Sequence, residues 1–185
     1  MDPRLPQAHS VWLCPERTAH DLLAGHIARL LPLSFGVGFA PHVTLLGDMQ
    51  GAPQTTMDAC DQMFHDHGPV TATVTGIAQS ERFFMSLFLD LALAPDMAEP
   101  RQTLQEITGS QGQTPLRAHL SLAYGVRPGA LEAADIAALA AVFQGMTFDL
   151  DHGVVVLSSQ ETAIADWRVV HRFALAGVQM PDCEK

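Results

Sequence analysis

The sequence predicts a mixed α+β fold of two lobes that share one cleft. Short apolar segments with strand character alternate with segments whose apolar residues follow helical spacing. One four-residue pattern, a histidine followed by an apolar, a hydroxyl and an apolar residue, occurs at 42–45 and again at 119–122. Each copy lies between two expected helices. We therefore expect residues 1–185 to form a single domain with two lobes, each contributing one motif strand to the cleft.

The composition indicates a folded protein outside the membrane. Apolar residues make up 48% of the chain and charged residues 16%, far from the composition of a disordered chain. No run of 18 apolar residues is present, and the first residues lack the apolar core of a signal peptide. Cys14, Cys60 and Cys183 are widely scattered, which favours free thiols in a reducing compartment. We expect a cytoplasmic monomer.

The first half of the chain is expected to run strand, helix, loop, motif strand, helix. Residues 9–14 (HSVWLC) form the first strand. Residues 18–31 carry apolar residues at helical spacing, and a proline follows each of these two segments. The segment 34–41 is a loop, in which Pro41 favours an extended backbone at the preceding residue and leads the chain into the first motif. A second helix is expected at 53–65.

The second half begins with a hairpin and ends with strands. Residues 70–77 alternate threonine with apolar residues, which is typical of a half-exposed strand, and 82–91 is its apolar partner. Helices are expected at 95–108, before the second motif, and at the alanine-rich segment 131–143. Three closing strands are expected at 147–150, 154–159 and 167–175.

The repeated motif predicts acid–base chemistry on a phosphodiester. Alternate side chains of a strand share one face, so His42 and Thr44 lie together, as do His119 and Ser121. Two such strands face to face would present two imidazoles and two hydroxyls to one pocket. One histidine can be neutral and the other charged near pH 7, and the hydroxyls can donate to the phosphate oxygens. The sequence does not decide which histidine is the acid, although we prefer His42 in that role.

Other polar and aromatic residues give weaker indications. Histidines 65 and 67 flank an aspartate, but one such pair near a helix end does not make a metal site, and we expect neither a metal nor a cofactor. Trp12 is a candidate wall of the cleft and a candidate surface for base stacking. Arg117 comes two residues before His119 and could share its strand face, where it would bind phosphate.

The charge of the chain restricts the substrate. The net charge is −10, with 10 Lys and Arg against 20 Asp and Glu, and no basic stripe is visible. Proteins that follow a long phosphate backbone usually carry such a stripe. We therefore expect a small nucleotide as the partner and no long nucleic acid.

The motifs resemble those of the two-histidine (2H) phosphoesterase superfamily. His119 lies 77 positions after His42, a spacing similar to that of the superfamily. Within it, the chain is most similar to the cyclic phosphodiesterases of plants and yeast. The matching stretches are 10–13 (SVWL), 41–45 (PHVTL), 119–124 (HLSLAY) and 166–169 (DWRV).

This resemblance implies a bilobal fold of two antiparallel-sheet lobes, with helices outside and a central cleft. It implies catalytic roles for His42, Thr44, His119 and Ser121, with Tyr124 in the cleft. The implied activity is metal-independent hydrolysis of ADP-ribose 1″,2″-cyclic phosphate or nucleoside 2′,3′-cyclic phosphates. The alternative is an RNA 2′,3′-cyclic phosphodiesterase or 2′-5′ RNA ligase-like enzyme that acts on RNA ends.

Overall fold

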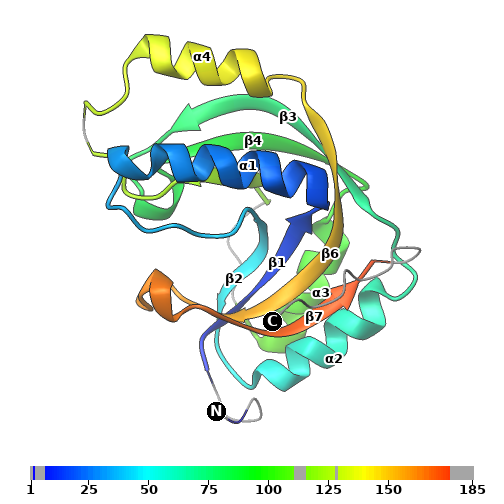
Figure 1. Ribbon diagram of the computed structural model, residues 1–185. Coiled ribbons are helices and arrows are strands. Elements are labelled where there is room, and N and C mark those ends of the chain that lie inside the picture. Colours follow the sequence, from blue (N-terminus) through cyan, green and yellow to red (C-terminus); the bar gives the residue numbers. More distant parts are fainter. Residues whose placement is uncertain (1, 3–6, 111–115, 128, 176–185) are drawn as a thin grey trace.

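The computed structural model describes residues 2, 7–110, 116–127 and 129–175, so Cys183 lies outside the described residues. The helices are α1 (Arg17–Leu30), α2 (Pro53–Phe64), α3 (Ala98–Thr108) and α4 (Ala133–Phe143). The strands are β1 (His9–Pro15), β2 (Val43–Met49), β3 (Val70–Gln79), β4 (Leu87–Ala94), β5 (His119–Ala123), β6 (Thr147–Leu157) and β7 (Arg168–Ala174). Short 3-10 turns lie at η1 (Leu31–Leu33), η2 (Phe83–Met85) and η3 (Ile164–Asp166). Figure 1 shows these elements along the chain.

The strands form one antiparallel sheet that closes on itself. Its order is β1-β2-β5-β4-β3-β6-β7, and β6 also pairs with β1. Six strands therefore make a closed, barrel-like sheet, and β7 extends it along β6. The predicted α+β class with antiparallel strands and outer helices is confirmed. The long strand β6 joins the first and last strands of this ring, because it pairs with β3 near its beginning and with β1 along the rest of its length.

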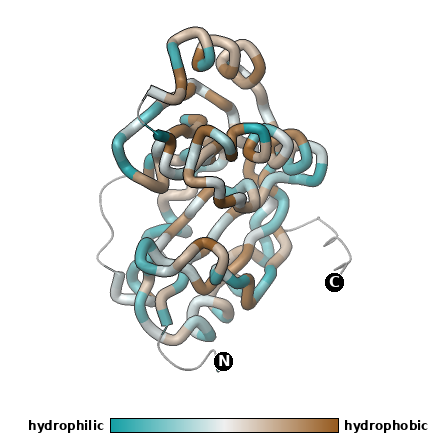
Figure 2. Tube along the Cα trace, turned by 60° about the vertical axis from the view of Figure 1, so that its left-hand side comes forward, coloured by the Kyte–Doolittle hydropathy of each residue, from teal (hydrophilic) through white to brown (hydrophobic). Residues whose placement is uncertain are grey.

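The helices cover different parts of this sheet. Figure 1 shows α4 above β3 at one end of the molecule, and α2 and α3 near β7 at the other, while α1 crosses between them. The main core gathers apolar side chains from both motif strands, including Val43, Leu45, Leu120 and Leu122. In Figure 2, α4 is mostly tan or brown, because it is rich in alanine, and only Phe143 on this helix is buried. Among the described residues, no helix is long and apolar enough to cross a membrane.

The elements expected from the sequence are present, with two corrections. The strands expected at 147–150 and 154–159 are one continuous strand, β6. Gly153 lies in the part of β6 between the two expected strands. A Cβ at this position would lie 2.1 Å from the ring of Phe173, so the glycine makes room for that ring on the neighbouring strand. The expected strand at 82–91 begins only at Leu87, because Phe83–Met85 form the turn η2.

The two motif strands lie side by side and not face to face as expected. β2 and β5 pair antiparallel at Val43 and Leu120, both fully buried. In an antiparallel pair the residues before and after such a contact oppose one another. His42 therefore lies beside Ser121, and Thr44 beside His119, all on the face away from the core.

Candidate active site

One cavity contains both motifs. Its volume is about 1090 Å³, and the residues that line it include His42, Thr44, His119 and Ser121. His42 immediately precedes β2 and Thr44 lies at its start, while His119 and Ser121 lie at the start of β5. The structure thus brings together the four side chains that the repeated motif singled out.

A backbone carbonyl fixes each histidine ring in the same way. The Nδ1 atom of His42 lies 2.7 Å from the carbonyl oxygen of Ala40, and the Nδ1 atom of His119 lies 2.9 Å from that of Arg117. Because a carbonyl only accepts hydrogen bonds, each Nδ1 carries a proton and donates. In the neutral ring, Nε2 then holds a lone pair that can accept a proton. This is the tautomer that a phosphodiester between the two rings would require.

Burial makes both imidazoles harder to protonate. His42 is only 6% exposed, and burial lowers its pKa to about 4, although the hydrogen bond to Ala40 opposes this shift and the charge of His119 adds to it. Burial also lowers the pKa of His119, while its hydrogen bond to Arg117 raises it. The positive charge of Arg117 lowers the pKa of His119 further, and the negative charge of Asp90, a smaller contribution, raises it. In the free protein, a shared proton is therefore better accommodated on His119 than on the buried His42.

Tyr124 and Trp12 both contact His42 within the cavity. The Tyr124 hydroxyl lies 3.4 Å from Nε2 of His42, where it can donate to the lone pair of the neutral ring. Burial raises the pKa of this hydroxyl, partly offset by a hydrogen bond with Ser121. The ring of Trp12 stacks on His42, with centroids 3.8 Å apart and planes at 13°. One face of Trp12 is thus occupied by the histidine, which it holds in place.

The cavity has an aromatic wall that the sequence only partly indicated. Phe84 stacks on Trp167 at 5.7 Å and meets Tyr124 edge to face at 5.2 Å, while Trp12 meets Trp167 edge to face. Trp167 belongs to a stretch that resembled the cyclic phosphodiesterases. Phe84 was expected within a strand, and the apolar run around it gave no sign that it would turn toward a cavity.

The Ser121 hydroxyl already has a partner in the free protein. It donates to the carbonyl oxygen of Phe84 at 2.8 Å, and so connects β5 to the turn η2. The amide of Gly125 donates to the carbonyl of Phe83 at 2.9 Å and strengthens the same connection. To donate to a phosphate oxygen, the Ser121 hydroxyl would have to rotate away from Phe84.

Arg117 does not line the main cavity. Its guanidinium makes two hydrogen bonds of 2.8 Å to the carboxylate of Asp90 and lies 4.9 Å from the centre of the Phe88 ring. It lines an adjoining pocket that shares Thr44 and His119 with the main cavity. The phosphate contact expected of Arg117 thus stays a prediction, confined to that second pocket.

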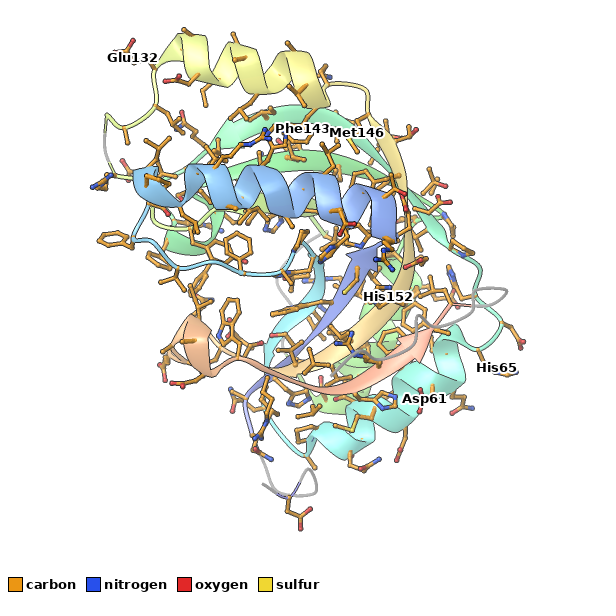
Figure 3. All side chains as sticks on the ribbon, in the orientation of Figure 1. Asp61, His65, Glu132, Phe143, Met146 and His152 are labelled. Carbon is orange, nitrogen blue, oxygen red and sulfur yellow. The ribbon has the colours of Figure 1, made fainter. Side chains whose placement is uncertain are left out.

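The remaining histidines do not contribute to this cavity. His9 repeats the backbone contact of the motif histidines, but its Nε2 bonds the buried hydroxyl of Thr56 at 2.8 Å, so both ring nitrogens have structural partners. Figure 3 shows His65 at the end of α2, on the opposite side of the view from η3, and His152 on β6. Within the described parts of the chain, no three His, Cys, Asp or Glu side chains gather as metal ligands would.

Comparison with known proteins supports the fold. No family model and no curated protein matches the chain. Solved structures do match. The apo structure of E. coli LigT aligns with a TM-score of 0.60 at 13% identity, covering 92% of this chain and 98% of that chain. The protein TT0787 of Thermus thermophilus aligns with a TM-score of 0.64 at 15% identity, covering 93% of this chain and all of that chain (100%). E. coli LigT complexed with 3′-AMP aligns with a TM-score of 0.59 at 14% identity, covering 92% of this chain and 99% of that chain.

These similarities extend over nearly the full length of both chains. The closed antiparallel sheet with its outer helices is the fold of these solved structures, and the resemblance to the 2H phosphoesterases continues to rest on the motifs. None of the three structures is described as a plant or yeast cyclic phosphodiesterase. The closer resemblance to that branch therefore stays a prediction.

Proposed function

We propose that the protein hydrolyses cyclic phosphodiesters of small nucleotides by acid–base catalysis with His42 and His119. The observation that carries the proposal is that both imidazoles, each fixed through Nδ1 to a backbone carbonyl, line one cavity beside Thr44 and Ser121. A phosphate bound there would have a ring nitrogen on either side and hydroxyl donors next to its free oxygens. This arrangement needs no further chemical group to exchange the two protons of hydrolysis.

The surroundings of the histidines favour His42 as the base. Its Nε2 lone pair faces the Tyr124 hydroxyl, and its burial disfavours the charged form. His119 is only half-buried and is therefore the better site for a proton in the free protein. This assignment reverses our preference from the sequence, which had no information on burial.

The reaction then proceeds by in-line attack of water. Nε2 of the neutral His42 takes a proton from the water as its oxygen bonds to phosphorus. The bond from phosphorus to one ribose oxygen breaks, and this oxygen receives the proton of the His119 imidazolium. The product is a phosphate monoester. Thr44 and Ser121 stabilise the charge that develops on the non-bridging oxygens.

The solved structures add chemical support. E. coli LigT is known in complexes with 3′-AMP and with phosphate. 3′-AMP is a nucleoside monophosphate of the kind that opening of a 2′,3′-cyclic phosphate releases. In our chain, the aromatic wall of Phe84, Tyr124 and Trp167 offers a surface for the base of such a nucleotide.

Action on RNA ends is the second candidate. The observation in its favour is the pocket next to His119, which extends the site beyond a single nucleotide phosphate. The net charge of −10 argues against a long RNA, because a basic track would strengthen its binding.

The experiment is hydrolysis in EDTA of a substrate panel by the purified protein. The panel contains nucleoside 2′,3′-cyclic phosphates, ADP-ribose 1″,2″-cyclic phosphate, an RNA with a 2′,3′-cyclic phosphate end, and 2′-5′-linked RNA. We expect turnover of the small cyclic phosphates with a higher kcat/KM than for either RNA. A higher kcat/KM for the RNA substrates would support the second candidate, and turnover of none of them would remove both.

A further inference from the structure

The pocket next to His119 gathers arginines in an otherwise acidic chain. Its volume is about 880 Å³, and three of the chain's ten basic residues, Arg82, Arg101 and Arg117, line it. Among the described residues, Asp48 is the one acidic residue that lines it, and its carboxylate accepts hydrogen bonds of 2.9 and 2.7 Å from the backbone and side-chain amides of Gln160. The pocket is therefore suited to an anion.

Arg82 lies where this pocket meets the catalytic cavity. It lines both, together with Thr44 and His119, and among the described residues it is the one arginine or lysine that lines the cavity. Its side chain forms no ion pair with a described residue. In contrast, Arg117 is paired with Asp90, and Arg101 donates to the carbonyl of Leu45 at 2.6 Å.

The backbone around Arg82 is held in place although the side chain is exposed. Its amide donates to the Ser80 hydroxyl at 3.2 Å, and its carbonyl accepts from the amide of Met85 at 3.0 Å. The following turn, η2, is joined to β5 through Ser121 and Gly125. The fold thus fixes the base of a charged side chain close to the motif residues.

We infer that Arg82 and the pocket behind it bind a second phosphate group of the substrate, on the His119 side of the reacting phosphate. The inference depends on the proposed function in one respect, because it assumes that the reacting phosphate lies between the two histidines. The aromatic side chains Trp12 and Tyr124 contact His42, whereas the pocket lined by the arginines includes His119 and not His42. The preferred substrate therefore carries its base toward Phe84 and Trp167, and a further phosphate toward Arg82. A nucleoside cyclic phosphate with a 5′-phosphate or diphosphate fits this description, and so does the last linkage of an RNA end.

The test is equilibrium titration with product-like nucleotides, which requires no turnover. Adenosine 3′,5′-bisphosphate and 3′-AMP differ by one phosphate. A charge-assisted contact to that phosphate should make the bisphosphate bind about tenfold more tightly or better. Arg82→Gln should remove most of this preference and Arg82→Lys should retain part of it. The control Arg29→Gln, which removes an equal charge from the exposed side of α1, should leave the preference unchanged.

Equal affinity of the wild-type protein for the two nucleotides would overturn the inference, as would an Arg82→Gln variant with the wild-type preference. A third ligand, the dinucleotide ApA with a 3′-phosphate, identifies the source of the second phosphate. If the dinucleotide binds as tightly as the bisphosphate, the subsite accepts the phosphodiester linkage of an RNA end. If the dinucleotide binds more weakly, the subsite prefers a terminal phosphate. If the preference is present but no cyclic phosphate is hydrolysed, the subsite stands and the proposed activity falls.

Discussion

Val43 of β2 pairs with Leu120 of β5, and this contact places two histidines and two hydroxyls on one face of the sheet. Both apolar side chains point into the main core, so their neighbours His42, Thr44, His119 and Ser121 point away from it. Each histidine then lies beside the hydroxyl residue of the other motif. The site results from two features: side chains alternate between the two faces along each motif strand, and the antiparallel register of β2 and β5 sets the two motifs side by side.

The assignment of acid and base can be tested with an activated leaving group. A nucleoside 3′-(4-nitrophenyl phosphate) releases nitrophenolate, which needs no proton from the enzyme. If His119 is the acid, His119→Ala should lose about 10²-fold or more in kcat on a cyclic phosphate but much less on the activated diester. His42→Ala, which removes the base, should lose a similar factor on both substrates. The opposite pattern, with His42→Ala spared on the activated diester, would restore His42 as the acid.

The pH dependence of kcat/KM should reflect two imidazoles that are harder to protonate than usual. The rate requires one neutral and one protonated histidine, so kcat/KM peaks midway between the two pKa values, whichever residue is the acid. The pKa of His42 is lowered to about 4 and that of His119 lies below its ordinary value of 6.5. We therefore expect the maximum of kcat/KM below pH 6.5, with a loss of activity toward pH 8. A maximum above pH 7 would show that the imidazoles are not buried as described.

The strand β6 depends on a glycine that accommodates a ring. A Cβ at Gly153 would lie 2.1 Å from the Phe173 ring, which is buried and stacks on Phe64. Gly153→Ala should reduce the free energy of unfolding by about 1–3 kcal/mol through overpacking, as measured by urea denaturation. The matched control is Gly76→Ala in β3, where no atom lies within 4 Å of the added Cβ, and it should be neutral or slightly stabilising. Equal stability of the two variants would contradict the packing described for β6 and β7.

The sequence predicted the elements well because local patterns determine them. Apolar residues at helical spacing, together with the positions of the prolines, were sufficient to predict the helices α1 and α2. The alternation of hydroxyl and apolar residues in the two motifs was sufficient for β2, β5 and the four side chains that they present. The prediction left residues 151–153 out of the strand β6, because the room that Gly153 makes for the Phe173 ring depends on a neighbouring strand that no local pattern identifies.

What the sequence could not predict depends on contacts between distant segments. The adjacency of the motif strands follows from the closure of the whole sheet, and no local pattern carries it. Phe84 faces the cavity because Ser121 and Gly125 hold the turn η2 against β5. The contrast between His42 and His119, which favours one as base and the other as acid, arises because Trp12 and Tyr124 help to bury His42, while His119 is only half-buried.

The central claim is that two imidazoles act together on one phosphodiester, and single-histidine variants test it most directly. Initial rates of hydrolysis of adenosine 2′,3′-cyclic phosphate in EDTA should be measured for the wild-type protein, His42→Ala and His119→Ala. The control is His65→Ala, because His65 is exposed at the end of α2 and outside the cavity (Figure 3). Each motif variant should lose at least about 10²-fold in kcat, or about 2.7 kcal/mol of transition-state stabilisation, with a much smaller change in KM. The control should match the wild-type protein, and near-wild-type turnover by either motif variant would contradict the account.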